Sequence, residues 1–232
     1  ISNPGGSGDG LIRGYRLPPW PLREARRQWR DVQTRLPGLS AAKFDAFNWL
    51  TRRFGLLTDP EIRLLAPLAP LGLAVDVGGH RGQSICALQR YLRPERIISC
   101  EPNPTLAARL AEKFGSAGKV EIVNAAMGRS AGTARLHVPR YRGYEFDGLA
   151  SLDPVLAESW LSADRIARFD PRLLEVLHHD VAVTPLDALD LAPDLIKIDT
   201  QGTELEVVMG ALGTLERSRP VVIIERPGEA LV

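Results

Sequence analysis

The chain has 232 residues, 44% of them hydrophobic, and a formal net charge of +1. This length suits one large domain or one domain with an extension, and the near-zero charge gives no sign of a polyanionic partner. Cys86 and Cys100 lack the spacing of a metal site or of a disulfide framework, and no apolar run is long enough for a transmembrane helix. We therefore expect a cytoplasmic protein that binds neither nucleic acid nor a membrane.

The N-terminal part of the chain divides into a tail and a helical extension. The start, ISNPGGSGDG at residues 1–10, is rich in glycine and serine and lacks the features of a signal peptide, so we predict a flexible tail. Apolar residues then recur at helical spacing in residues 21–36 and 40–55. Asp59-Pro60 is typical of a helix start. Residues 11–70 are therefore predicted to form a helical N-terminal extension.

After this extension, short apolar strands alternate with amphipathic helices. The strands are AVDV, RIISC and KVEIVNAAM, followed much later by LIKID and VVIIE, and the helices between them include GQSICALQRYL, PTLAARLAEKF and TELEVVMGAL. This alternation predicts βαβ units and a parallel sheet with both faces covered. We therefore assign residues 71–232 to one α/β domain.

Residues 133–190 are less regular than the rest of this domain. TARLHV alternates like a strand, and residues 153–169 have helical character. Between them, PRYRGYEFDGLASL at residues 139–152 combines glycines, aromatic residues and charges, which is typical of a lid or an ordered loop. His178 and His179 are interpreted as solvated residues that precede a strand.

The turn after the first strand has the composition of a ligand site. Open parallel sheets bind ligands beyond the carboxyl ends of their strands, and glycines there let the backbone approach the ligand. The dinucleotide pattern G-x-G-x-x-G is not matched, because Val77 stands at its first glycine position. An acid before the turn is suited to receive an ammonium group. The predicted ligand residues here are Asp76, Gly78, Gly79, His80, Gly82 and Ser84.

The next two strands end in residues that suit a nucleoside. Glu101 follows the second strand, where a carboxylate is placed to hold the two hydroxyls of a ribose. Small residues after the third strand leave room for a flat adenine ring. The predicted ligand residues here are Glu101, Pro102, Asn103, Asn124, Ala125 and Ala126.

The chain resembles the FkbM-type methyltransferases in a series of segments that keep the same order. These segments are DVGGHRGQS, CEPNP, VNAAMGRSAGTARL, GLASL, VAVTPLDAL, LIKIDTQGTELEVVMGA and VIIE, and together they cover about residues 73–226. The glycine turn also resembles motif I of class I S-adenosylmethionine-dependent methyltransferases, although His80 stands where the FkbM family usually has asparagine. The LIKIDTQGTELEVVMGA segment is the most specific part of the resemblance.

The resemblance implies a Rossmann-like class I methyltransferase sheet, S-adenosylmethionine as the cofactor, and methylation of a hydroxyl on a small molecule such as a polyketide or sugar. That fold normally continues after the strand VVIIE with a helix and an antiparallel strand pair. We therefore expect the C-terminal strands to be missing from this chain, or the sheet to be completed in another way.

Catalytic candidates cluster after the strand LIKID. Methyl transfer to a hydroxyl requires alignment of the reacting atoms and removal of a proton. Asp199 is the predicted base or orienting group, and Gln201 and Glu204 are the next catalytic candidates. Glu225 ends the neighbouring strand, so a divalent cation held by Asp199 and Glu225 is an alternative to the metal-free site that we expect.

Two other functions fit parts of the sequence. A nicotinamide-dependent oxidoreductase uses a similar sheet, but the missing first glycine and the acid at Asp76 argue against it. A non-catalytic binding module would use the N-terminal helices as a docking surface. The presence of Asp76, Glu101 and Asp199 makes this the weaker interpretation. We therefore expect an S-adenosylmethionine-dependent O-methyltransferase that acts on a small hydroxylated acceptor. The sequence identifies neither that acceptor nor the oligomeric state.

Overall fold

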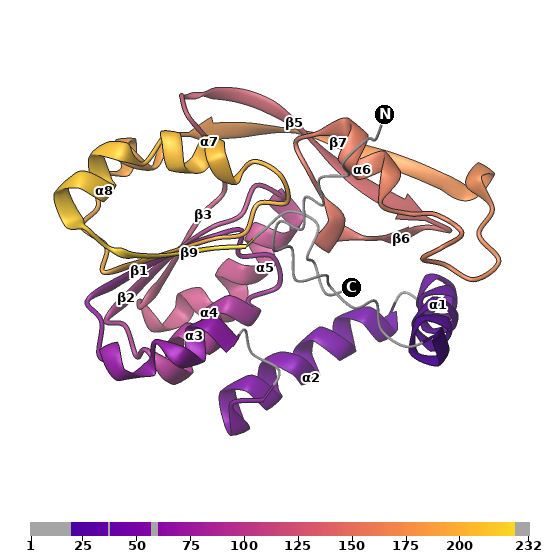
Figure 1. Ribbon diagram of the computed structural model, residues 1–232, viewed down its shortest axis with the longest axis horizontal. Helices are drawn as coiled ribbons and strands as arrows, with labels where there is room; N and C mark the ends of the chain where they lie inside the picture. The colour runs from indigo at the N-terminus through magenta and orange to yellow at the C-terminus, as the bar shows by residue number, and fades with distance from the viewer. Residues whose placement is uncertain (1–19, 37, 57–59, 226–232) are drawn as a thin grey trace, which may run out of the picture.

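The computed structural model describes residues 20–36, 38–56 and 60–225. At its centre is a five-stranded parallel sheet with the strand order β3-β2-β1-β8-β9 (Figure 1). The three inner strands are buried almost throughout, as expected where helices cover both faces of a sheet. The strands are β1 (Leu73–Val77), β2 (Arg96–Cys100), β3 (Val120–Val123), β8 (Leu195–Ile198) and β9 (Val221–Ile224).

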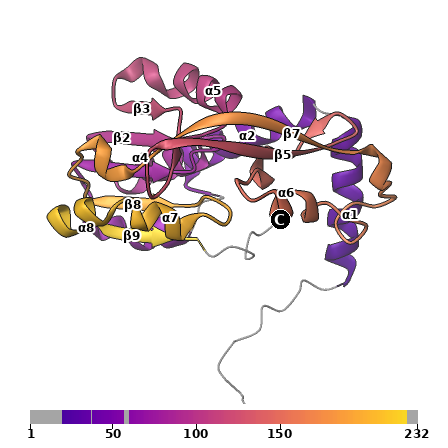
Figure 2. The same ribbon diagram turned by 90° about the horizontal axis from the view of Figure 1, so that it is seen from above.

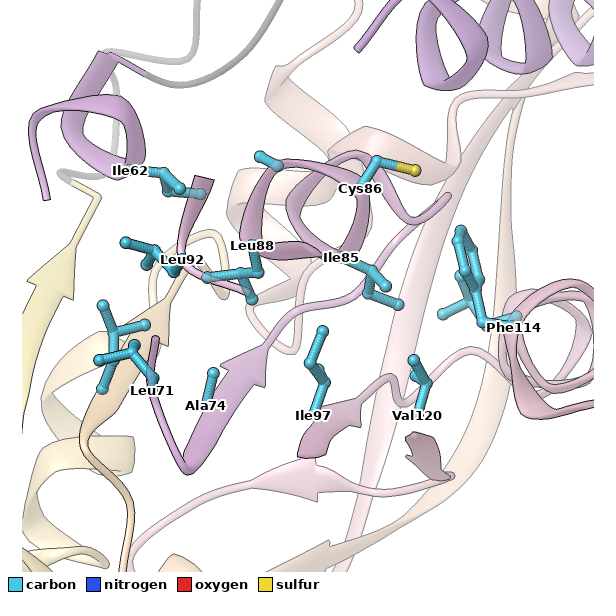
Figure 3. Packing of buried hydrophobic residues seen from close by; sticks show 13 residues of the cluster. Ile62, Leu71, Ala74, Ile85, Cys86, Leu88, Leu92, Ile97, Phe114 and Val120 are labelled. Carbon is cyan, nitrogen blue, oxygen red and sulfur yellow. The ribbon is translucent and has the colours of Figure 1, made fainter. Parts of the chain in front are cut away.

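Helices cover the two faces of this sheet and bury a separate core on each. On one face, Ile85 and Leu88 of α4 pack over Ala74 and Ile97 of the sheet (Figure 3). On the other face, the core includes Val207 of α7. The expected Rossmann-like α/β arrangement is therefore confirmed. The helices of these two layers are α4 (Gln83–Tyr91), α5 (Pro104–Phe114) and η2 (Gly115–Ala117) on the first face, and α7 (Glu204–Met209) and α8 (Leu212–Ser218) on the second.

A second sheet, which the sequence did not predict, is inserted between β3 and β8. Its strand order is β4-β7-β5-β6, and β5 and β7 form a long antiparallel ribbon that extends over the edge of the first sheet (Figure 2). The predicted lid segment forms its far end. The elements of this insertion are β4 (Ala126–Met127), β5 (Gly132–Tyr141), β6 (Tyr144–Glu145), η3 (Asp147–Leu149), α6 (Pro154–Ser159), η4 (Pro171–Leu173), β7 (Leu174–Thr184) and η5 (Leu186–Leu189).

Three sequence-based predictions in this region are wrong. The segment KVEIVNAAM is not one strand, because Asn124 donates hydrogen bonds to the carbonyls of Glu101 and Pro102, and the chain turns there into the second sheet. His178 and His179 lie inside β7, not before a strand, because both faces of this ribbon are partly solvated and accept polar residues. The helix predicted across residues 153–169 extends only through α6.

The N-terminal extension is helical, as predicted. It contains α1 (Trp20–Arg35), α2 (Gly38–Phe54), α3 (Pro60–Leu64) and η1 (Ala66–Leu68), and α2 packs on α4. The predicted tail at residues 1–10 lies outside the described residues, as does Asp59. Within the part of the chain that the structure describes, no helix combines the length and apolar character needed to cross a bilayer.

A buried carboxylate links α1 to the second sheet. Asp31 has 0% exposure and accepts hydrogen bonds from Arg142 Nη1 (2.8 Å), in the turn before β6, and from Arg168 Nη2 (2.6 Å), in the loop before β7. Burial alone would raise the pKa of Asp31, but the hydrogen bonds and charges of Arg168, Arg35 and Arg142 outweigh it and lower that pKa. The ionised carboxylate therefore stabilises the contact between the extension and the insertion.

Asp31→Asn should lower the free energy of unfolding at pH 7 by about 1.5–3 kcal/mol, the usual contribution of hydrogen bonds to a charged group. Because the folded-state pKa is below the unfolded value, the contribution of Asp31 is present above about pH 4 and disappears as the pH falls through the folded-state pKa. Urea unfolding of the variant and wild type at pH 7 and pH 3 measures this difference. Equal stabilities at pH 7 would contradict a net contribution from Asp31.

Candidate active site

A cavity of about 120 Å³ lies at the carboxyl ends of β1, β2 and β8. The order of strands reverses between β1 and β8, and open α/β sheets bind their ligands at such a point. Residues from the glycine turn, from the end of β2, from β4 and from the turn after β8 form its wall, and the segment after β6 closes it. The predicted site residues that line the cavity are Gly78, His80, Glu101, Pro102, Ala125, Ala126, Asp199 and Gln201.

The other predicted residues surround this cavity without lining it, and several of them hold the wall in place. Asn103 caps α5, since its Oδ1 accepts the N–H groups of Thr105 and Leu106. Asn124 holds the carbonyls at the end of β2, as described above. The predicted residues placed behind the wall are Asp76, Gly79, Gly82, Ser84, Asn103, Asn124 and Glu204.

Asp76 is fully buried inside β1 and faces α4. Its Oδ2 accepts hydrogen bonds from Ser84 Oγ (2.8 Å) on α4 and Ser99 Oγ (2.9 Å) on β2, while Oδ1 has no hydrogen-bond partner within the described part of the chain. Burial raises the pKa of Asp76, although the charge of Lys197 and the two hydroxyls act against this. In this structure the carboxylate joins two strands and a helix, and Asp76 is not among the residues that line the cavity.

Gly78 brings the backbone of the turn against the end of β8. Its φ angle is +96°, and a Cβ atom at this position would lie 1.9 Å from the carbonyl oxygen of Asp199. Only glycine satisfies both conditions. The neighbouring Gly79 and Gly82 face Ser99 and Phe114 respectively, so these glycines serve the packing of strand against helix.

Glu101 presents a fixed carboxylate to the cavity. Its Oε2 accepts the N–H of His80 (2.7 Å) and its Oε1 accepts the N–H of Asn103 (2.8 Å). Burial raises the pKa of Glu101, while the N–H of Asn103 and the charge of His80 oppose the rise. A carboxylate has about four lone-pair positions, so two remain free for hydroxyl groups of a ligand.

Asp199 sits at the centre of a polar group on the opposite wall. Gln201 Nε2 donates to Oδ1 (2.9 Å) and Lys197 Nζ donates to Oδ2 (3.2 Å). The register of β8 and β9 places Glu225 beside Asp199, as predicted. Burial alone would raise the pKa of Asp199, but the charge of Lys197 and the hydrogen bonds of Glu225, Gln201 and Lys197 lower it. These surroundings therefore favour the ionised form of Asp199.

These surroundings do not suit a divalent cation. Lys197 already donates to Asp199, and its positive charge would repel a cation at this carboxylate. In the described ranges, no group of three or more histidine, cysteine, aspartate or glutamate residues is arranged to hold a metal ion. The alternative of a cation between Asp199 and Glu225 therefore has no support in the geometry.

Glu204 shapes the turn that carries Gln201. Its Oε1 accepts the N–H and hydroxyl of Thr200 (both 3.2 Å) and the N–H of Gly202 (3.0 Å). Gln201 itself has a left-handed backbone with φ of +56°, and the turn directs it to the cavity. Glu204 thus has a positioning role here, behind the wall.

Sequence reasoning missed the residues of the lid segment that close the cavity, although it predicted a lid at residues 139–152. Asp147, Gly148, Ala150 and Leu152 all line it. Asp147 Oδ1 lies 3.1 Å from His80 Nε2, and its Oδ2 accepts from Arg81 Nε (3.0 Å). Burial alone would raise the pKa of Asp147, but His80 and Arg81 lower it. The sequence signal that could have identified Asp147 is its position between Phe146 and Gly148 in the predicted lid.

Comparison with known proteins agrees with this arrangement. The family model described as the methyltransferase FkbM domain matches residues 76–229. No curated protein matches the chain. Among solved structures, the crystal structure of methyltransferase FkbM from Methylobacillus flagellatus KT is 19% identical with a TM-score of 0.44, and the alignment covers 77% of this chain and 36% of that one. Because the family model matches well over half of the residues, including every strand end that forms the cavity, the chain belongs to the FkbM methyltransferase family.

Proposed function

We propose that this methyltransferase uses S-adenosylmethionine and transfers the methyl group to a hydroxyl oxygen of a small molecule. The observation that carries the proposal is Glu101, a buried carboxylate that faces the cavity at the end of β2 with both oxygens fixed by backbone N–H groups. Such a carboxylate suits the two hydroxyls of a ribose. The free, buried cysteines are compatible with the reducing cytoplasm, where we place the protein.

The residues around the cavity fit this cofactor. Glu101 would hold the ribose hydroxyls, and the small side chains of Ala125 and Ala126 would leave room for the adenine. The backbone at Gly78 would lie along the amino-acid portion. Bound S-adenosylmethionine would supply an electrophilic methyl group on a good leaving group.

Asp199 would orient the acceptor hydroxyl. A general base works best with a pKa near the operating pH, whereas the pKa of Asp199 is lowered by its surroundings. An ionised carboxylate of this kind is a strong hydrogen-bond acceptor, so it would hold the hydroxyl in line and stabilise the positive charge that develops on its proton. Lys197 and Gln201 fix the carboxylate from two sides. The acceptor is proposed to be a small molecule because the resemblance to the FkbM family implies one.

Glu101→Ala should weaken the binding of S-adenosylhomocysteine roughly ten- to a hundredfold, because charged hydrogen bonds contribute about 1.5–3 kcal/mol. Isothermal titration calorimetry measures the affinity, and circular dichroism checks that the fold is intact. Glu121→Ala is the matched control, since this glutamate lies on the next strand with its side chain 62% exposed. Unchanged affinity in Glu101→Ala would remove the ribose assignment.

A titration of the wild type with both classes of cofactor tests the proposal as a whole. Binding of S-adenosylhomocysteine without binding of NADH is expected. The reverse result would favour the oxidoreductase, and binding of neither would favour a non-catalytic module. Labelled S-adenosylmethionine with a panel of glycosides, polyketides and other hydroxylated metabolites would then identify the acceptor.

A further inference from the structure

Three cationic side chains come together between the N-terminal extension and the second sheet. Arg30 lies on α1, Lys43 on α2, and Arg165 in the loop between α6 and η4. Arg30 Nη1 donates a hydrogen bond to the carbonyl oxygen of Arg165 (3.3 Å), and the charge of Arg30 acts on Lys43. All three residues are partly buried. We call Arg30, Lys43 and Arg165 the cationic cluster.

The cationic cluster has no counter-ion among the described residues. Asp31, which follows Arg30 in the sequence, pairs with other arginines, and no carboxylate of the described ranges forms an ion pair with the cluster. Burial, followed by the charge of Arg165, lowers the pKa of Arg30 to about 10, and burial, followed by the charge of Arg30, lowers the pKa of Lys43. Buried charges are normally paired, because removing them from water is costly. The cluster therefore has the electrostatics of a site for an anion.

Aromatic rings hold two of these cations in place. Lys43 Nζ lies 5.4 Å from the ring centroids of Phe44 and Phe47, and the guanidinium carbon of Arg165 lies 4.5 Å from the ring centroid of Trp160. A cation–π contact fixes the position of a cation without neutralising its charge. The charges of the cluster thus remain available to a ligand.

The same aromatic rings connect the cluster to the cavity. Phe44 packs edge-on against the ring of His80, with 5.5 Å between the centroids, and His80 lines the cavity. Trp160 belongs to the same apolar core as Leu149, whose neighbour Gly148 also lines the cavity. Two separate contacts therefore place the cluster next to the cavity wall.

We propose that the cationic cluster binds a phosphoryl group of the methyl acceptor, so that the acceptor is a phosphorylated hydroxyl compound. The anion site stands on the geometry of the cluster, whereas the acceptor as its occupant rests on the proposed function. Three cations suit a phosphoryl group, which carries a charge of roughly −2 near neutral pH. Arginine also binds phosphate oxygens through paired hydrogen bonds. The hydroxyl of the same molecule would enter the cavity toward Asp199.

Thermal unfolding in inorganic phosphate tests the anion site without cofactor or acceptor. With ionic strength held constant by chloride, phosphate should raise the melting temperature of the wild type until the effect saturates. Lys43→Met removes one charge and keeps an apolar stem, so it should weaken phosphate binding about tenfold or more. Lys119→Met is the matched control, because Lys119 is exposed and lies outside the cluster. Absence of a saturable effect in the wild type, or an equal effect in Lys43→Met, would overturn the proposal.

Paired acceptors test the occupant of the site. A panel of hydroxylated compounds, each offered with and without a phosphoryl group, is assayed with labelled S-adenosylmethionine. The phosphorylated member should have a kcat/KM about tenfold or more higher, and Lys43→Met should remove this preference. Equal or better methylation of the unphosphorylated members, or no methylation of any phosphorylated one, would overturn the acceptor assignment. Failure of the wild type to bind S-adenosylhomocysteine would instead defeat the proposed function and leave the phosphate response intact, so the two failures are distinguishable.

Discussion

Asp199→Asn should lower the rate of methyl transfer by about 100-fold or more, whereas the affinity for S-adenosylhomocysteine should change little. The substitution keeps the size of the side chain but removes the charge that we propose orients the acceptor hydroxyl. The proposed cofactor contacts of Glu101 lie at a different strand end, and the variant leaves Glu101 in place. Single-turnover assays with labelled S-adenosylmethionine, together with calorimetry, separate the two effects.

Asp190→Asn is the matched control for this experiment. Asp190 has its side chain 97% exposed and a left-handed backbone, a conformation that asparagine adopts readily, so its turnover should equal that of the wild type. Addition of a chelator should also leave turnover unchanged, given the surroundings of Asp199. Near-normal turnover in Asp199→Asn would show that positioning by the rest of the cavity is sufficient. Loss of turnover on chelation, restored by magnesium, would reinstate the cation.

Gly78→Ala should destabilise the fold by about 3 kcal/mol or more, even without any ligand. The new methyl group would lie 1.9 Å from the carbonyl oxygen of Asp199, and the φ angle of +96° is strained for any residue with a Cβ atom. Overpacking of a rigid site adds typically about 1–3 kcal/mol to that strain. Urea unfolding of the ligand-free protein measures the effect.

Gly132→Ala provides the comparison, because a Cβ atom at that position meets nothing within 4 Å. It should unfold like the wild type. If Gly78→Ala were equally stable but bound no cofactor, the glycine would serve the ligand and not the contact between β1 and β8. Comparison of the two variants therefore shows whether the glycine at position 78 is needed for packing or for cofactor binding.

The alternation of short apolar strands with amphipathic helices predicted the parallel sheet, because most of these elements follow one another directly in the chain. The second sheet was missed because its main pairing joins residues far apart, such as Gly132 and Val183. Leu136 and Val138 of β5 and Val181 of β7 form one apolar face of the ribbon, but such alternation does not identify which strands pair. Pairing over such a distance leaves no trace in the periodicity of either segment.

The same reasoning explains which site residues the sequence could place. Parallel strands end at one edge, so Glu101 and Asp199 were predicted to meet the same cavity, and both line it. Side chains alternate between the faces of a strand, and Asp76 stands one position before Val77, which lines the cavity. Its carboxylate therefore turns toward α4. Asp147 was not predicted to be a site residue, because its contact with His80 depends on the fold of the whole insertion.

The contacts of Asp31 with Arg142 and Arg168 make the N-terminal extension part of the framework that holds the second sheet in place. Arg142 lies in the turn that begins the lid, whose far end carries Asp147. The segment that matches the FkbM family, residues 76–229, includes Arg142 and Arg168 but not Asp31 on α1. A protein in which an unrelated sequence replaced α1 would leave both arginines without their shared carboxylate. Substitutions in α1 can therefore change the stability of the insertion without altering any residue that lines the cavity.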